Sequence, residues 1–195
     1  MNNMTDKLAE PLRLPCGAIL PNRLCKAAMT EGLADPLLRA TPRHETLYRT
    51  WSEGGAGLLL TGNVQVDRTD LERPGNVAID VSEPRTVSPE ARQRLRDWAR
   101  AGTIRGNHLW MQISHAGRQS PRYVTGKPLA PSAVQLDMLG NYATPLALTE
   151  AGIVGLIERY GQGGSGEEAK EEPYDSSFLI ADAAGGWIIE TRNRS

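Results

Sequence analysis

The 195-residue sequence contains little cysteine, histidine or phenylalanine: two cysteines, three histidines and one phenylalanine. Cys16 and Cys25 cannot build a disulfide framework or a complete zinc site. Both suit a reducing compartment as ordinary thiols, so we expect a cytoplasmic protein. None of the histidines stands in a His-x-x-x-His pattern or at ligand spacing from a carboxylate, so no metal is predicted.

The sequence also lacks an excess of charge and a long apolar run. The net charge of -1 and the pI near 6.3 predict neither nucleic acid nor an anionic membrane as a partner. No apolar run approaches the roughly 20 residues of a membrane-spanning helix. The first seven residues lack the basic and apolar regions of a secretion signal. A small-molecule ligand is the remaining expectation.

The N-terminal region has the pattern of short strands. Residues 12–24 alternate apolar and polar positions around Pro15 and Gly17, which predicts a β-hairpin. The small, apolar residues 24–30 then predict a strand buried on both faces. Residues 57–66 give the strongest strand signal, with an unbroken Leu-Leu-Leu-Thr run, and residues 109–114 give a further strand.

Helix signals separate and follow these strands. Thr41-Pro42 and Ser88-Pro89 each supply an N-cap and a proline at the first helical position, and Thr149 opens a further helix with an apolar face. Strands that alternate with helices predict an α/β fold with a parallel sheet or barrel. The pattern alone does not distinguish these two. The length falls short of the about 250 residues of a complete (β/α)8 barrel.

The composition changes at residue 161, where a glycine-rich, acidic stretch begins. We therefore divide the chain into residues 1–160 and a linker with a tail at 161–195. Two apolar triplets, Phe178 to Ile180 and Trp187 to Ile189, could form a hairpin within this tail.

Polar or small residues stand where the three strands should end. Thr30 brings a hydroxyl, Gly62 permits close backbone approach, and Gln112 brings an amide. At such strand ends they could line a planar polar ligand, or they could simply begin ordinary loops. His115 follows the third strand beside Arg118 and marks the same edge as a candidate site.

Several separated blocks occur together in one order: Leu-Pro-Asn-Arg-Leu at 20–24, Lys-Ala-Ala-Met-Thr-Glu at 26–31, Glu-Gly-Gly-Ala-Gly-Leu-Leu-Leu-Thr-Gly-Asn-Val at 53–64, Gln-Ile-Ser-His-Ala-Gly-Arg-Gln at 112–119 and Ala-Pro-Ser-Ala-Val at 130–134. Over residues 11–160 the sequence thereby resembles the N-terminal half of the Old Yellow Enzyme family of NADH:flavin oxidoreductases. The resemblance implies an incomplete TIM (β/α)8 barrel, with about the first three βα units preceded by a β-hairpin.

The resemblance also implies a cofactor and a reaction. FMN would contact Ala27, Ala28, Met29, Thr30, Gly62 and Gln112, with the Thr30 hydroxyl donating near a flavin carbonyl. Hydride would pass from NAD(P)H through the flavin to an electron-poor alkene or a similar small-molecule acceptor. His115 and Arg118 would shape the surrounding loop.

Other parts of the family pattern are missing. The later histidine pair that holds the acceptor and the residues that hold the FMN phosphate have no counterpart here, so no catalytic residue is assigned. We expect a truncated oxidoreductase, and the sequence does not decide whether this chain is active. One alternative is a non-catalytic fragment that persists by self-association or by binding a partner chain that covers its open barrel edges. Another is a small, complete α/β protein with a different ligand.

Overall fold

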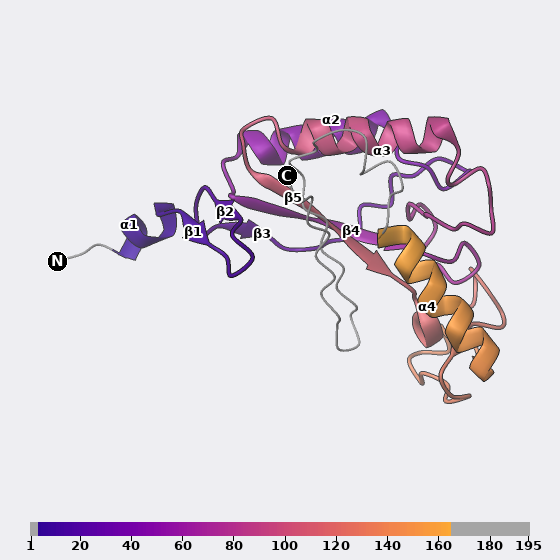
Figure 1. Cartoon of the computed structure of the whole chain (residues 1–195). Coiled ribbons are helices and arrows are strands. Elements are labelled where there is room, and N and C mark those ends of the chain that lie inside the picture. The colour runs from indigo at the N-terminus through magenta and orange to yellow at the C-terminus, as the bar shows by residue number, and fades with distance from the viewer. Residues whose placement is uncertain (1–3, 165–195) are drawn as a thin grey trace.

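The computed structural model describes residues 4–164, which include a small parallel sheet with two helices on one face (Figure 1). The tail hairpin expected near residues 178–189 lies outside the described residues. Helix α1 (Met4–Ala9) and the pair β1 (Leu12–Arg13) and β2 (Ile19–Leu20) project to one side of the sheet. The two strands are antiparallel, and Gly17 closes their turn at φ +96°. The predicted N-terminal hairpin is therefore confirmed.

The sheet consists of three parallel strands in the order β3, β4, β5. Their bounds are Cys25–Lys26, Leu58–Gln65 and His108–Ser114, which confirms the second and third predicted strands. The first prediction, a strand over residues 24–30 buried on both faces, was wrong in extent. Only Cys25 and Lys26 pair with β4, and Leu24 is 47% exposed. Because β3 is an edge strand in the described sheet, only one side of it finds a partner.

Helices α2 (Pro42–Glu53) and α3 (Pro89–Gly102) lie side by side over one face of the sheet (Figure 1). Both begin as predicted, after Thr41 and Ser88, and the Ser88 hydroxyl accepts a hydrogen bond from the Ala91 N–H. Their buried aromatic residues Tyr48 and Trp98 meet edge to face, with ring centroids 5.2 Å apart. This contact sits in the main apolar core, which also contains residues of β4 and β5.

An irregularity in β4 keeps its apolar side chains on the helix side. The register with β5 shifts between Leu60 and Asn63. In an uninterrupted strand Leu59 and Val64 would point to opposite faces, yet both belong to the core beneath the helices. In β5, Leu109, Met111 and Ile113 belong to this core, while the alternate residues His108, Trp110 and Gln112 are half-buried. The face opposite the helices is thus the less covered one.

One asparagine ties the two turns at the amino ends of β3 and β4. The Asn22 side chain donates to the Gly55 carbonyl at 2.8 Å and accepts from the N–H groups of Gly57 at 2.8 Å and Leu24 at 3.0 Å. A side chain at Gly57 would come within 2.6 Å of the Asn22 carbonyl oxygen. The glycine at position 57 therefore allows Asn22 to pack against the turn at residues 54–57.

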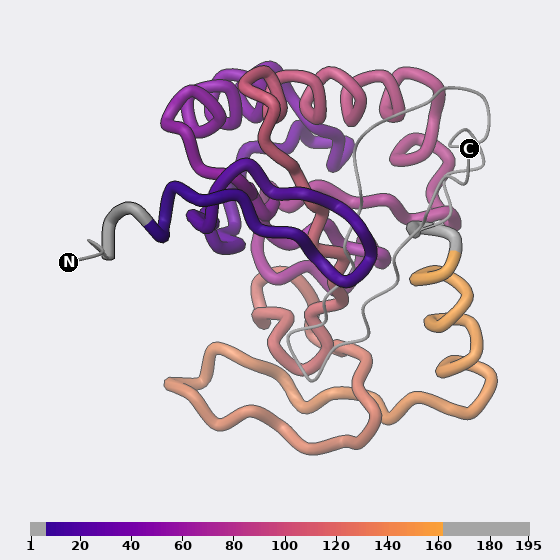
Figure 2. The backbone as a smooth tube through the Cα atoms, turned by 60° about the vertical axis from the view of Figure 1, so that its left-hand side comes forward, coloured from indigo at the N-terminus to yellow at the C-terminus, as the bar shows by residue number. Residues whose placement is uncertain are grey.

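The connection from β5 to α4 is long and runs far from α2 and α3 (Figure 2). It contains the short helix η1 (Gly117–Gln119) and a two-residue parallel pair, β6 (Leu129–Ala130) with β7 (Leu146–Ala147). Helix α4 (Glu150–Gly164) follows and packs Leu156 and Tyr160 on the core. It begins as predicted but continues four residues beyond residue 160. Among the described residues, none of the helices has the length and apolar character needed to cross a membrane.

Candidate functional site

The six residues proposed to contact a cofactor come from three neighbouring segments. Ala27 to Thr30 follow β3 outside its ladder, Gly62 lies in β4, and Gln112 lies in β5. Gly62 and Gln112 are therefore within their strands, not at the strand ends as the sequence suggested. Ala27 and Met29 are exposed, Ala28, Thr30 and Gln112 are half-buried, and Gly62 is buried.

A chain of hydrogen bonds joins Thr30 to Gln112. The Thr30 hydroxyl donates to Oε2 of Glu72 at 2.5 Å, and the Asn63 side-chain amide donates to the same oxygen at 2.6 Å. Asn63 and Gln112 are register partners across β4 and β5. The Gln112 amide donates to Oδ1 of Asn63 at 2.7 Å. The structure thus brings Thr30 and Gln112 into one network through two residues that the sequence analysis did not assign.

Gly62 lies against the segment that follows β3. Its N–H donates to Oε1 of Glu31 at 2.9 Å, and the Tyr48 hydroxyl donates to the same carboxylate oxygen. A Cβ at Gly62 would come within 2.5 Å of the Met29 carbonyl oxygen and 2.7 Å of Thr30 Cα. Because the β3–β4 ladder ends at Lys26, Glu31 supplies a link that the ladder no longer provides.

Burial and the charge of Glu31 change the protonation behaviour of its neighbours. Burial raises the pKa of Tyr48 strongly, and the nearby Glu31 carboxylate raises it further. Burial lowers the pKa of Lys26, while the charge of Glu31 opposes that change. The Lys26 ammonium donates to the Leu60 carbonyl at 2.8 Å and lies 4.2 Å from the centroid of the Trp51 ring. This cluster holds the residues after β3 beside the helix layer.

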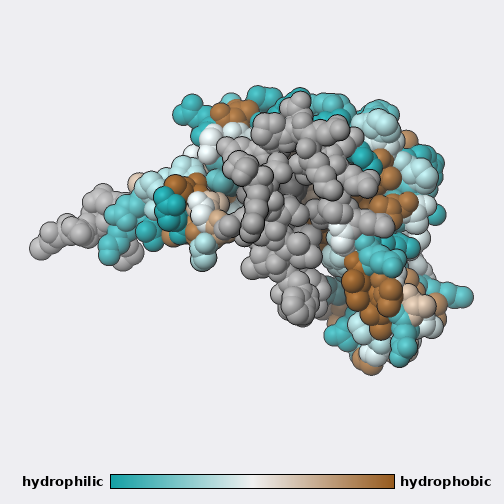
Figure 3. Space-filling view, in the orientation of Figure 1, coloured by the Kyte–Doolittle hydropathy of each residue, from teal (hydrophilic) through white to brown (hydrophobic). Residues whose placement is uncertain are grey.

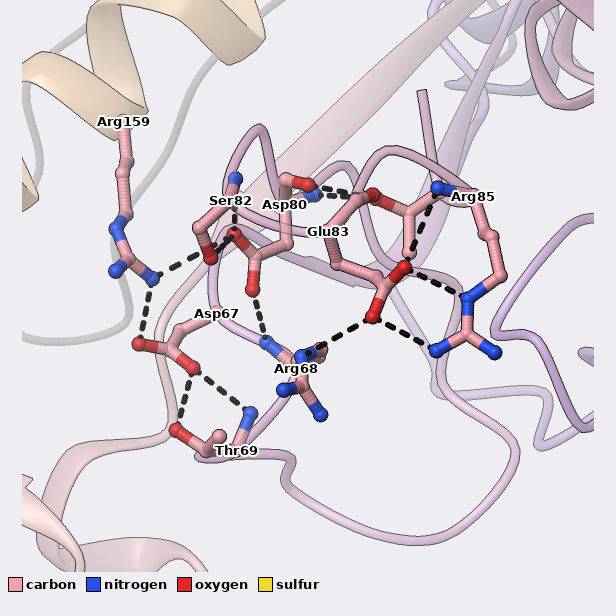
Figure 4. A network of polar contacts seen from close by, with 9 residues as sticks. Asp67, Arg68, Thr69, Asp80, Ser82, Glu83, Arg85 and Arg159 are labelled. Carbon is pink, nitrogen blue, oxygen red and sulfur yellow. Dashed lines mark hydrogen bonds and ion pairs between the residues drawn. The ribbon is translucent and has the colours of Figure 1, made fainter. Parts of the chain in front are cut away.

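A second polar cluster lies between α4 and the loop that follows β4 (Figure 4). Arg159 of α4 pairs with Asp67 at 2.7 Å and with Asp80 at 3.6 Å. Burial acts to raise the pKa of Asp67, but hydrogen bonds from Thr69 and the charge of Arg159 hold it below its ordinary value. A cavity of about 170 Å³ opens beside this cluster and is lined by Asp67, His115, Leu129, Leu148, Gly152, Gly155, Leu156 and Arg159.

His115 belongs to this second cluster. One ring nitrogen of His115 and one carboxylate oxygen each from Asp67 and Asp70 lie within 4.8 Å of one another. His115 Nδ1 accepts the Gly117 N–H at 3.1 Å, so the other ring nitrogen carries the proton in the neutral ring. Arg118 lies in η1 and is exposed.

Sequence reasoning missed Glu31 and Glu72 as members of the site. Glu31 directly follows Thr30, and this adjacency was the one available signal. Glu72 lies in the loop after β4, 42 residues from Thr30 in sequence, and only the fold brings the two together.

Comparisons with known proteins identify relatives of the chain. The chain is 41% identical over 134 residues to the NADH-dependent flavin oxidoreductase iliE of Neonectria sp., a match that covers 66% of this chain and 17% of that protein. It is 34% identical over 179 residues to the NADH-dependent flavin oxidoreductase nadA of Aspergillus parasiticus, covering 87% and 39%. The chain belongs to the Old Yellow Enzyme family of NADH:flavin oxidoreductases. It spans less than half the length of these relatives, and no protein-family profile matches it.

Solved structures of Old Yellow Enzymes share the fold. The Old Yellow Enzyme homologue from Zymomonas mobilis superposes with a TM-score of 0.71 at 23% identity, covering 90% of this chain and 48% of that one. Morphinone reductase in complex with tetrahydroNAD gives 0.69 at 21% identity, with the same coverage. The described residues thus have the fold of part of a TIM barrel of this family.

The six residues can be tested against a flavin, the cofactor that the family implies. The exposed Ala27 and Met29 leave their surface open, which fits a flat ring. Gly62 is different, because a Cβ there would meet the Met29 carbonyl and the Glu31 carboxylate, so its missing side chain makes room for this neighbouring segment. Gln112 offers an amide for polar ring edges. One feature departs from expectation: the single Thr30 hydroxyl proton is donated to Glu72, whereas the family resemblance expects a donor toward the ring.

Proposed function

We propose that this chain carries the flavin-contacting part of an FMN-dependent oxidoreductase that uses NADH or NADPH. The observation that supports this most is the hydrogen-bonded connection of Thr30 with Gln112, with Gly62 in the adjoining strand position before Asn63. The names of the relatives support a flavin and NADH. We further propose that the described elements correspond to the hairpin and the first three βα units of a (β/α)8 barrel.

Each residue would have a defined part in holding the ring. Ala27, Ala28 and Met29 would pass along it, Gly62 would approach its edge through its backbone, and Gln112 would pair with a polar edge. A bound FMN would supply hydride transfer from NAD(P)H to an electron-poor alkene or similar acceptor. The chain's own contribution is binding and orientation, because no side chain of the six transfers a proton. Its two free thiols suit a reducing compartment such as the cytoplasm.

Anaerobic reduction of flavin tests this function. The chain is loaded with FMN, freed of excess cofactor and mixed with NADH or NADPH while the visible flavin absorbance is followed. We expect the absorbance to fall and to return when an electron-poor alkene is added. Free FMN at the same concentration is the blank. The Gln112→Ala variant is measured in parallel and should retain less FMN. Bound flavin that neither nicotinamide reduces would contradict the proposal.

Uncovered surfaces favour a second function, which is association with another chain. Ile153, Val154 and Ile157 form an exposed apolar strip on α4, and brown side chains gather over this region in Figure 3. The buried indole N–H of Trp110 has no hydrogen-bond partner within the described part of the chain. Both features suit a fragment that functions by association with a second chain. Light scattering coupled to gel filtration tests this alternative, which requires a species heavier than one chain.

A further inference from the structure

Glu72 is the only member of the Thr30–Gln112 network that cannot donate a hydrogen bond when ionised. A carboxylate has acceptor oxygens alone, whereas a hydroxyl and a primary amide each have donors and acceptors. Both the Thr30 hydroxyl and the Asn63 amide converge on one oxygen, Oε2 of Glu72. The direction of every other bond in the network follows from this one residue.

The orientation of two amides can be traced from Glu72. Asn63 must turn its NH2 group toward the carboxylate, which leaves its Oδ1 facing Gln112. Gln112 must then turn its own NH2 group toward Asn63. Consequently Gln112 keeps its Oε1 and one N–H for other partners. Thr30, whose only hydroxyl proton is used, keeps lone pairs alone.

We propose that Glu72 is a specificity-determining residue that sets the hydrogen-bond polarity of the cofactor face. With Glu72 in place, the face offers an acceptor at Thr30 and therefore pairs there with a ligand N–H group, not with a carbonyl oxygen. The identity of the ligand as a flavin rests on the function proposed above. The polarity itself rests on contacts among Thr30, Asn63, Glu72 and Gln112.

Two substitutions separate acceptor geometry from charge. Glu72→Gln removes the charge but retains a carbonyl oxygen that can accept from both Thr30 and Asn63. Glu72→Ala removes the acceptor, which frees the Thr30 proton and releases Asn63 and Gln112. Glu53→Ala, at the exposed end of α2, is the matched control for loss of a carboxylate.

The first measurement needs no cofactor. The side-chain NH2 signals of Asn63 and Gln112 are followed by ¹⁵N NMR in the full chain and in the three variants, with thermal unfolding recorded in parallel. We expect Glu72→Ala to shift both pairs of signals and to speed their exchange with solvent, while Glu72→Gln and Glu53→Ala leave the Gln112 pair in place. A Gln112 pair that is unchanged in Glu72→Ala would overturn the proposal.

The second measurement is the dissociation constant for oxidised FMN, whose ring carbonyls only accept. Glu72→Ala should bind FMN about two- to tenfold more tightly than the unsubstituted chain, the range of one net hydrogen bond. Glu72→Gln should match the unsubstituted chain. Equal gains in both variants would assign the effect to charge and overturn the proposal, as would weaker binding by Glu72→Ala. If no variant binds FMN, the proposed function fails and the NMR result alone decides on Glu72.

Discussion

The hydroxyl of Tyr48, in the middle of α2, donates a hydrogen bond to the carboxylate of Glu31 in the segment after β3. This bond joins the helix layer to the segment that carries Thr30. Tyr48 is fully buried, so the bond is shielded from water. The position of the proposed cofactor segment therefore depends on a residue that contacts no cofactor.

Replacing Tyr48 with phenylalanine should weaken the fold by about 1–3 kcal/mol, because a half-buried carboxylate loses one donor. Burial and Glu31 raise the pKa of Tyr48 above its ordinary value of 10.0 in the folded protein. Its contribution to stability is thus complete below pH 10 and is lost as the pH rises above that value. Urea unfolding from pH 7 to 11 should show this alkaline loss in the original chain and a smaller one in Tyr48→Phe. Tyr123→Phe, at a side chain that is 73% exposed, is the control.

Gly62→Ala should disrupt the site because the new methyl group would collide with the Met29 carbonyl and the Glu31 carboxylate. We expect a loss of about 1–3 kcal/mol, as for overpacked interiors, together with weaker FMN binding. Gly126→Ala is the matched control, since a methyl group at that position would meet no atom within 4 Å. Equal unfolding midpoints for the two variants would show that Gly62 has room after all.

Arg159→Met should loosen α4, because Asp67 and Asp80 are both buried and share this one guanidinium. The partly exposed arginine is screened by water, so we expect a loss of about 1–3 kcal/mol at neutral pH. The lowered pKa of Asp67 means that its stabilisation is present above an ordinary carboxyl pKa of about 4 and is lost as the pH falls through the folded value.

Without Arg159 the pKa of Asp67 should rise, and acid unfolding should begin at a higher pH than in the original chain. Circular dichroism during an acid titration measures this shift. The exposed Arg49 of α2 supplies the control substitution, Arg49→Met. Identical acid unfolding curves for the original chain, Arg159→Met and Arg49→Met would show that the ion pair does not hold Asp67 ionised.

The sequence predicted helices and strands correctly where its local signals agreed with the burial that the fold imposes. Thr41-Pro42 and Ser88-Pro89 mark the true starts of α2 and α3, and the unbroken apolar run at Leu58 to Leu60 lies in a strand. The sequence did not predict the length of β3 correctly. How far an apolar segment pairs within a sheet depends on the strands beside it, and the segment's own residues do not show this. The β6–β7 pair was not foreseen for a similar reason, since two residues of parallel ladder carry no periodicity.

The candidate site was predictable only in part. Thr30, Gly62 and Gln112 stand out because each follows or interrupts an apolar stretch of the sequence, and the fold brings their segments together. Glu72 lies in a polar loop where an acidic residue carries no signal, and its contact with Thr30 depends on how that loop folds back. The direction of a hydroxyl proton is likewise set by three-dimensional contacts, which is why the donor expected at Thr30 was not found.

Co-elution of FMN with the chain tests the central claim most directly. The chain is mixed with FMN and passed through gel filtration while protein and flavin absorbance are recorded separately, with Gln112→Ala run in parallel. We predict a yellow, folded protein peak that retains less flavin when Gln112 is replaced. A folded but colourless protein, or equal flavin retention by the variant, would contradict the claim.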